Sequence, residues 1–414
     1  MFKKFFLLFL TATIILSACG TMEVTIKQIP TPAAPAIDPT KVALEGEATA
    51  MRNFLTQQAA TLWPPTPLPP PPPTFIPAQK LPILSPENAA QITLLTRLEG
   101  TAIQVAWSPD GKLLAIGSTS GIYLYDSKTM KQQRLIDAVR DIKGMAFSPD
   151  GHVLVSASFS LAMPQLWDVG TGQLLRTLGK QEQRAANVAF NPNERMLPLE
   201  GGSNGNLTSV AFSPDGRTVA TGSTYGVVTL WDAVNGQAIR NMNPLIDPAT
   251  GTALREAYTS DFVPSMVFSP DGHILASGGN GGIKLWAPDS GQLLSTLEAQ
   301  RGASSIAFSS DGHTLASAGI GDGAVRLSDV GSGQLLRTLQ GEWATIVTFS
   351  PNGRMIASGG KATLELWDTA SDQLLHTLGE QWAQWVSSIA FSPDGRMIAV
   401  GTKDGTLIYG ILPH

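Results

Sequence analysis

A short turn that recurs about every 40 residues constrains this chain more than any other feature. Its best-preserved copy, Ser392-Pro393-Asp394-Gly395, follows the apolar run Ser388–Phe391. Six further copies, some of them worn, begin at Ser108, Ser148, Ser213, Ser269, Ser309 and Ser350. The successive intervals are 40, 65, 56, 40, 41 and 42 residues. A fixed period of this length is typical of radial or stacked repeat arrays.

The first two strands of each unit flank this turn. The segment 103–107 alternates apolar and small residues with a period of two, as a strand that packs on two faces does. In the turn that follows, Pro fixes φ, Asp can bond its own backbone, and Gly supplies a positive φ. The segment 113–116, closed by Gly117, then predicts a second strand.

Two more strands complete each unit. The third ends in an aromatic residue followed by Asp at Tyr125, Trp167, Trp231 and Trp367, with worn copies at Trp286, Ser328 and Tyr409. The fourth has the sequence of Gln173–Leu178, which recurs almost unchanged at Gln334–Leu339 and Gln373–Leu378. Four short strands in about 40 residues predict one blade of β-sheet per unit.

The order of the strands indicates how the array closes. Only Leu412-Pro413-His414 follows the last third strand, whereas Leu94–Leu98 resembles a fourth strand and precedes the first unit. We expect this N-terminal strand to complete the last blade, which closes the ring and removes an exposed sheet edge. Seven turns therefore predict an all-β, seven-bladed β-propeller of four-stranded antiparallel blades over residues 89–414.

With these repeats the chain resembles the WD-repeat β-propellers over roughly residues 90–414. That family usually carries a Gly-His dipeptide before the first strand, where this chain has Gly179-Lys180, Gly341-Glu342 and Gly379-Glu380. We therefore expect the buried His–Asp network of eukaryotic members to be absent and apolar packing between blades to provide rigidity. The resemblance implies a non-catalytic scaffold for protein–protein interaction.

The N-terminus reads as an export signal, residues 1–19. Lys3 and Lys4 precede the apolar run Phe5–Leu16, which is too short to span a bilayer. The run ends in Leu16–Gly20, which resembles the lipobox of bacterial lipoproteins, with Cys19 as the lipidated residue. We expect a lipid anchor on the extracytoplasmic side of a membrane in the bacterial cell envelope. The alternative is an ordinary secretory signal that happens to contain Cys19, the only cysteine and hence no source of an intrachain disulfide.

Residues 20–88 carry no repeat and read as a linker. The tract Pro64–Pro73 favours polyproline II and would give a semi-rigid rod of about 30 Å. We interpret it as a stalk, and the alternative is a docking motif for an aromatic groove. Apolar residues spaced along one helical face predict a short helix over 41–62, which either lies on a surface or frays because an isolated helix of this length is marginal.

Two features suggest where a partner could bind. The long intervals place extra residues in loops 179–207 and 241–261, on one face of neighbouring blades. The residues six positions before the aromatic end of each first strand are Thr101, Asp141, Asn206, Phe262, Gly302, Trp343 and Trp385. In WD-repeat propellers these positions rim the central opening and often contact partners.

The large aromatics at these positions, Phe262, Trp343 and Trp385, with Trp382 just before the last, are candidate partner-binding residues, since exposed tryptophans often anchor interfaces. The alternatives are that they plug the channel or pack on neighbouring loops, and that the long loops are tolerated insertions.

No catalytic residue, metal site or cofactor is predicted. His152, His273 and His313 share one turn position with Lys and Arg of other units, so they sit on different blades and cannot meet. A net charge of −5 without a basic stripe makes nucleic acid a poor partner, and we expect a monomer that binds a protein or peptide. Alternative functions are an envelope-assembly accessory lipoprotein and a propeller hydrolase or ligand-binding protein.

Overall fold

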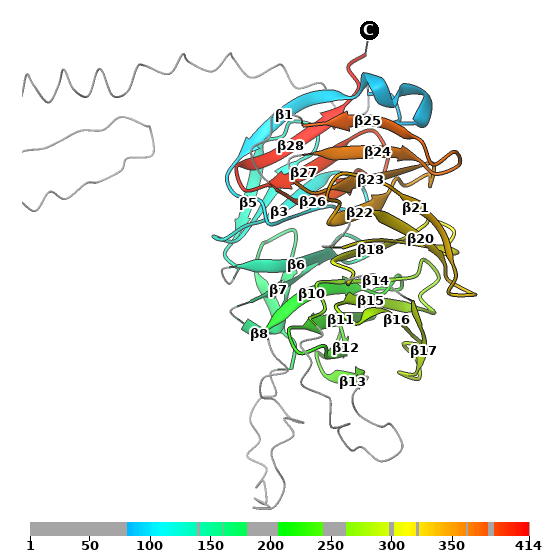
Figure 1. The fold of residues 1–414 in the computed structure, drawn as a ribbon. Coiled ribbons are helices and arrows are strands. Elements are labelled where there is room, and N and C mark those ends of the chain that lie inside the picture. The colour runs from blue at the N-terminus through cyan, green and yellow to red at the C-terminus, as the bar shows by residue number, and fades with distance from the viewer. Residues whose placement is uncertain are drawn as a thin grey trace, which may run out of the picture. The chain divides into compact units, whose positions relative to one another are not determined.

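The computed structural model describes residues 81–138, 141–159, 161–179, 206–242, 262–297, 302–319, 323–361, 363–379 and 385–413. In these ranges one short 3₁₀ helix, η2 (Pro86–Gln91), accompanies 28 strands. The strands form seven four-stranded sheets whose neighbours pair antiparallel (Figure 1). The predicted seven-bladed, all-β propeller is confirmed.

Each blade runs from an innermost to an outermost strand. Blade 1 comprises β2 (Gln104–Trp107), β3 (Leu113–Gly117), β4 (Ile122–Asp126) and β5 (Gln132–Ile136). Blade 2 comprises β6 (Ile142–Phe147), β7 (Val153–Ser158), β8 (Leu161–Asp168) and β9 (Leu174–Thr177). Blade 3 comprises β10 (Leu207–Phe212), β11 (Thr218–Ser223), β12 (Val228–Asp232) and β13 (Ala238–Met242). Blade 4 comprises β14 (Ser265–Phe268), β15 (Leu275–Gly279), β16 (Gly282–Trp286) and β17 (Leu293–Leu297).

The remaining blades follow the same order. Blade 5 comprises β18 (Ser305–Phe308), β19 (Thr314–Ala318), β20 (Val325–Asp329) and β21 (Leu335–Leu339). Blade 6 comprises β22 (Ile346–Phe349), β23 (Met355–Gly359), β24 (Leu364–Asp368) and β25 (Leu374–Leu378). Blade 7 comprises β26 (Val386–Phe391), β27 (Ile398–Thr402), β28 (Gly405–Gly410) and, as its outermost strand, β1 (Thr93–Glu99).

The N-terminal strand closes the ring. β1 pairs antiparallel with β28 from Thr93 opposite Gly410 to Glu99 opposite Gly405, and Figure 1 shows the two strands side by side. The innermost strands touch one another in the order β2, β6, β10, β14, β18, β22 and β26, and β26 returns to β2. The expectation that the strand before the first unit completes the last blade is confirmed.

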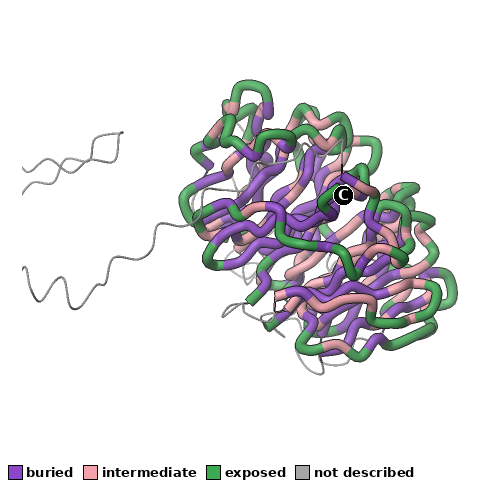
Figure 2. Tube along the Cα trace, turned by 90° about the horizontal axis from the view of Figure 1, so that it is seen from above, coloured by how far each residue is buried: buried purple, intermediate pink, exposed green. Residues whose placement is uncertain are grey.

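Apolar clusters between neighbouring blades form the core. The cluster between blades 7 and 1 contains Leu95 and Leu98 of β1 together with Val105 and Trp107 of β2. In Figure 2 the buried segments run along the strands and the exposed segments gather at the turns. Face-to-face packing of twisted sheets therefore supplies the apolar rigidity that we expected.

Polar bonds between blades add to this packing. Arg176 of β9 donates to the Asn235 carbonyl at 2.8 Å, and Arg337 of β21 donates to the Thr369 carbonyl at 2.9 Å. In each case the acceptor lies in the turn between the third and fourth strands of the next blade. The stem of Arg176 also packs on its turn, because a Cβ added to Gly236 would lie 2.5 Å from Arg176 Cδ.

The repeated turn is built around a shared carboxylate oxygen. In blade 2 the Ser148 hydroxyl donates to Asp150 Oδ1 at 2.5 Å, and the same oxygen accepts the His152 backbone N–H at 3.0 Å. Ser148 Oγ also accepts the Val153 N–H at 2.9 Å. Gly151 has φ 75°, a conformation in which glycine is not strained. These roles explain why Ser, Asp and Gly recur at this spacing.

Residues 81–92 pack on the ring before β1 begins. Leu81, Leu84 and Ile92 are buried, and the Leu84 N–H donates to the Gly395 carbonyl at 2.8 Å. η2 contacts β24 and β25, the outer strands of blade 6. This segment therefore covers the last two blades, although it has no counterpart in the repeat.

Candidate binding face

One face of the ring carries the residues just before each innermost strand and the turns between second and third strands, and we call it the rim face. The register of blade 6 establishes this, because Ile346 at the start of β22 and Leu364 at the start of β24 both pair with Gly359 at the end of β23. Blade 4 has the same register. The Ser-Pro-Asp-Gly turns therefore lie on the opposite face.

Trp343 is presented on the rim face in a strained conformation. Its side chain is 56% exposed, and its backbone has φ 60°, in the left-handed region. A Cβ added to Gly360, in the second turn of the same blade, would collide with the Trp343 carbonyl, so the two backbones are in close approach. A left-handed conformation costs a residue other than glycine about 1–2 kcal/mol. The equivalent residue of blade 5 is Gly302, with φ 91°, which adopts this conformation without that cost.

Trp385 lies against the same turn from the next blade. It is 51% exposed and forms an isolated antiparallel bridge with Lys361. The N–H of Val386 donates to the Gly360 carbonyl at 2.9 Å. The turn that follows β23 is thus bounded by Trp343 on one side and by Trp385 on the other. The structure brings these two predicted residues to a single turn.

A buried carboxylate holds the chain next to Trp343. Glu365 Oε1 accepts the Glu342 backbone N–H at 3.0 Å, and Glu365 Oε2 accepts the Ser358 hydroxyl at 3.3 Å. Ser358 Oγ in turn accepts a bond from Trp367 Nε1 at 2.9 Å. Burial raises the pKa of Glu365 above its ordinary 4.5, although both hydrogen bonds oppose the shift. These bonds connect the core of blade 6 to the residue that precedes Trp343.

Phe262 is on the rim face, but away from the two tryptophans. It is 37% exposed and precedes Val263, whose N–H donates to the Ser223 carbonyl of blade 3 at 3.1 Å. Tyr225, in the turn that follows Ser223, is 61% exposed, and Phe159 occupies the matching turn of blade 2. Sequence reasoning missed Tyr225 and Phe159. A comparison of the turns between second and third strands would have found them as bulky residues among small ones.

The other predicted elements have different outcomes. Trp382, Cys19, the segment 41–62 and nearly all of loops 179–207 and 241–261 lie outside the described residues. The third-strand tryptophans Trp167, Trp231, Trp286 and Trp367 are buried, and each donates its indole N–H to a Ser or Thr of the second strand at 2.9 Å. They pack in the apolar clusters between neighbouring blades.

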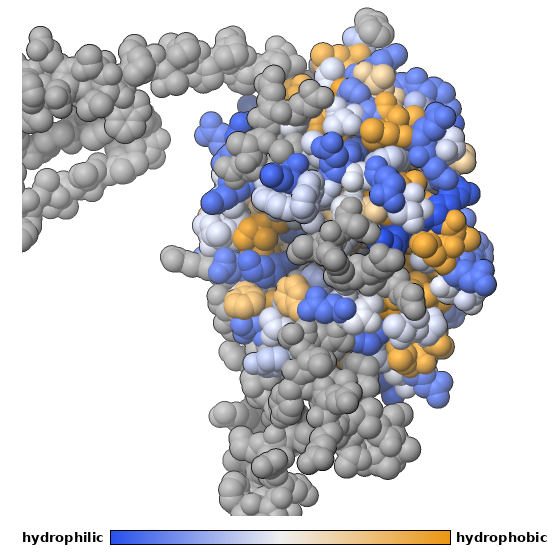
Figure 3. All heavy atoms as spheres, viewed as in Figure 1, coloured by the Kyte–Doolittle hydropathy of each residue, from blue (hydrophilic) through white to orange (hydrophobic). Residues whose placement is uncertain are grey.

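Exposed apolar residues also occur on the outer strands. Leu174, Leu175, Leu293, Leu294, Leu335 and Leu336 are among them. They recur from blade to blade, so they are spread around the circumference. On the side drawn in Figure 3, hydrophobic residues form separate patches among hydrophilic ones. Scattered exposed leucines are ordinary on protein surfaces, whereas two half-exposed tryptophans at one turn are not.

His152, His273 and His313 are exposed at the equivalent turn position of three different blades. Within these ranges no group of three or more His, Cys, Asp or Glu side chains could hold a metal ion. No helix found there has the length and apolar character needed to cross a bilayer.

Comparison with known families agrees with this architecture. The family model described as "WD domain, G-beta repeat" matches residues 92–126, 195–232, 251–287, 291–329, 333–368 and 372–409, which is more than half of the chain. This chain belongs to the WD40-repeat family. The strands of blade 2 fall outside the six matched segments, although the structure gives that blade the same four-stranded form.

Several known proteins are similar in sequence to part of this WD40 protein. Telomerase protein component 1 of Mus musculus is 27% identical over 52% of this chain, and the match covers 8% of that relative. COMPASS component SWD3 of Saccharomyces cerevisiae is 25% identical over 50% of this chain and 74% of its own length. Small ribosomal subunit protein RACK1 of Glycine max is 31% identical over 31% of this chain and 38% of its own length. These relatives have names from different cellular assemblies, so the comparison points to no single activity.

Proposed function

We propose that this WD40 propeller is a membrane-tethered, extracytoplasmic scaffold that binds a protein or peptide partner through its rim face without catalysis. The observation that carries the proposal is the pair Trp343 and Trp385, half exposed at one turn. Tryptophan is enriched among residues that dominate binding energy at interfaces.

The double variant Trp343→Gly/Trp385→Ala tests the binding face. We expect partner recovery after crosslinking in intact cells to fall at least about tenfold, since each anchoring tryptophan contributes about 2 kcal/mol or more. We expect the melting temperature to stay within a few degrees. Glycine at position 343 relieves the left-handed strain, which offsets its greater loss of backbone entropy on folding.

Leu336→Ala is the matched control, because Leu336 is about as exposed as Trp385 but lies on the outer strand β21. The variant should recover the same partners as the unmodified protein. Equal recovery from all three proteins, measured by quantitative mass spectrometry, would end the proposal for the rim face.

The sequence Leu16–Gly20 supports the tether, since a lipidated Cys19 would hold the protein at a membrane. Each buried methylene contributes about 0.8 kcal/mol, and two or more acyl chains give stable anchoring where one does not. We expect Cys19→Ser to remove incorporation of labelled fatty acid and to move the protein from the membrane fraction to the soluble fraction. Ser17→Ala leaves Cys19 in place and is the control. Membrane association that survives in the Cys19 variant would contradict lipid anchoring.

A further inference from the structure

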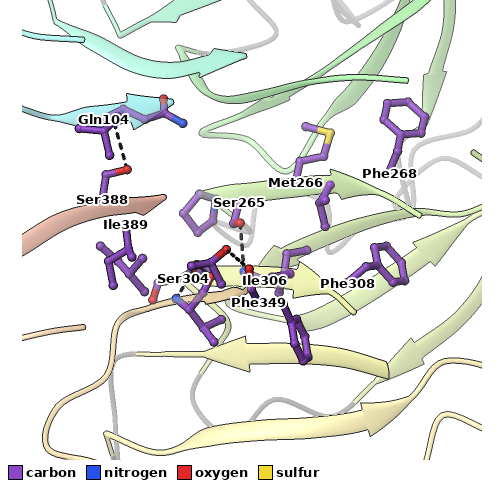
Figure 4. A pocket seen from close by; sticks show the side chains of 18 of the residues that line it. Gln104, Ser265, Met266, Phe268, Ser304, Ile306, Phe308, Phe349, Ser388 and Ile389 are labelled. Carbon is purple, nitrogen blue, oxygen red and sulfur yellow. Dashed lines mark hydrogen bonds between the residues drawn. The ribbon is translucent and has the colours of Figure 1, made fainter. Parts of the chain in front are cut away.

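The centre of the ring contains a polar cavity of about 540 Å³ between the innermost strands (Figure 4). Its described lining comes from blades 1, 2, 4, 5, 6 and 7. Lys143 of β6 is the charged residue in this lining, and none of the described lining residues is acidic. A volume in this range is typical of sites that bind small molecules. The protein as a whole is acidic, with a net charge of −5, so this cavity differs in sign from the average surface.

Two of the serine hydroxyls that face the cavity, those of Ser265 and Ser388, retain hydrogen-bond donors. Ser388 Oγ accepts the Val105 N–H at 3.1 Å, and Ser265 Oγ accepts the Ile306 N–H at 3.1 Å, so each serine connects its blade to the next. In these bonds the hydroxyl oxygen is the acceptor, and its proton stays available. No described residue accepts either proton. Figure 4 shows both side chains at the cavity.

Blade 1 departs from this pattern at the corresponding position. Gln104 stands where blades 4 and 7 have Ser265 and Ser388, and it follows Ser388 around the ring. Its Oε1 atom is buried and has no hydrogen-bond partner among the described residues. A buried amide oxygen without a partner destabilises the fold, and the oxygen and nitrogen of the amide can exchange places by rotation. The next blade contributes Lys143, whose side chain is exposed.

We propose that this cavity binds a small molecule through a carboxylate or phosphate group. Lys143 supplies the positive charge, the hydroxyls of Ser265 and Ser388 supply donors, and the amide of Gln104 completes the set. Carboxylates and phosphates only accept hydrogen bonds when ionised, and these groups offer donors without an opposing acid in the described lining. The innermost strands line the cavity and neither Trp343 nor Trp385 is in its described lining, so this site is separate from the tryptophans of the rim face.

Calorimetric titration of the purified protein with phosphate, succinate, tri-alanine and tri-alanine amide tests the proposal. We expect saturable one-to-one binding of at least one of the first three, at least tenfold weaker in Lys143→Met and partly restored in Lys143→Arg. Preference for tri-alanine over its amide and over succinate would identify a peptide C-terminus as the source of the anion. Preference for phosphate or succinate would identify a free small anion.

Two further variants separate binding from folding. Gln104→Leu removes the unpartnered amide, so it should weaken the anion severalfold without lowering the melting temperature. Lys361→Met, on the rim face, should bind the anion as the unmodified protein does. Binding of unchanged strength in Lys143→Met overturns the proposal, and so does the failure of all probes to bind more tightly than about 1 mM.

The result is independent of the proposed scaffold function. The Trp343→Gly/Trp385→Ala protein should keep its anion affinity, and Lys143→Met should keep its crosslinked partners. Loss of both properties in either variant would mean that the two sites are not separate as inferred.

Discussion

Replacing Leu95 and Leu98 together by alanine is expected to abolish cooperative folding of the whole ring. Both side chains are buried in the cluster that joins β1 and β28 of blade 7 to β2 of blade 1. Each Leu→Ala change in a core costs about 2–5 kcal/mol, whereas the stability of a folded protein is about 5–15 kcal/mol in total. Once β1 detaches, β28 becomes an open sheet edge and blade 7 no longer packs fully on blade 1.

Leu94→Ala on the same strand is the control, because Leu94 is 48% exposed and should change the melting temperature only slightly. Circular dichroism on heating and limited proteolysis measure the difference. If the double variant melted within a few degrees of the unmodified protein, the pairing of β1 with β28 would not determine the stability of the ring.

The repeat predicted the fold because each blade is specified locally. The Ser148–Asp150 bond, the left-handed Gly151 and the buried Trp167 are short-range features, and their equivalents recur around the ring. Their period fixed the number of blades, and the displaced copy Leu94–Leu98 fixed the closure. Blade 2 was found in this way although the family model does not match its strands.

Individual contacts between blades could not be predicted, because the repeat describes one unit at a time. Nothing in the sequence of 81–92 indicates that Leu84 bonds Gly395 from far along the chain. The bond of Arg176 to Asn235 likewise depends on how two blades pack. The burial of Glu365 could not be predicted, since a carboxylate within a strand reads as solvent-exposed until its neighbours are placed.

The sequence predicted which residues form the candidate site, but not their conformation or contacts. Counting back from each first strand found Trp343 and Trp385, because the start of that strand is fixed by the turn that follows it. The left-handed backbone of Trp343 and its close approach to Gly360 are not visible in the sequence. Tyr225 and Phe159 lie in turns between second and third strands, which a count back from the first strand does not reach.

We expect the repeated turn to make the propeller sensitive to acid. Hydrogen bonds from the turn serine and then from a backbone N–H hold the pKa of Asp150, Asp215, Asp271 and Asp311 below the ordinary value of 3.8. At Asp110 burial opposes the shift, but the bonds from Ser108 and Lys112 outweigh it and the pKa is about 2.

Because these folded-state pKa values are depressed, each carboxylate stabilises the fold at pH above 3.8. That stability is lost as the pH falls through the folded-state pKa. Glu365 has the opposite sign, since burial raises its pKa. Its contribution favours the fold below pH 4.5 and is lost as the pH rises.

We expect the variant with Asp150, Asp215, Asp271 and Asp311 all changed to Asn to resist acid better than the unmodified protein. Asn352 already occupies the equivalent position of blade 6, where its Oδ1 accepts the Ser350 hydroxyl at 2.7 Å and the Arg354 N–H at 3.1 Å. The amide therefore keeps the turn without a titrating group. Between about pH 4 and pH 2 the melting temperature should fall about twice as far in the unmodified protein as in the variant.

Differential scanning calorimetry across this range measures both slopes. Asp372→Asn is the control, because the Asp372 carboxylate lies at the surface outside the repeated turn and is paired with Arg337. This change should leave the slope nearly unchanged, since exposed ion pairs contribute little to stability. Parallel slopes for the fourfold variant and the unmodified protein would place the acid-sensitive groups elsewhere than in the turns. A shallower slope for the variant would show that the motif that sets the period of this sequence also sets the pH below which the ring unfolds.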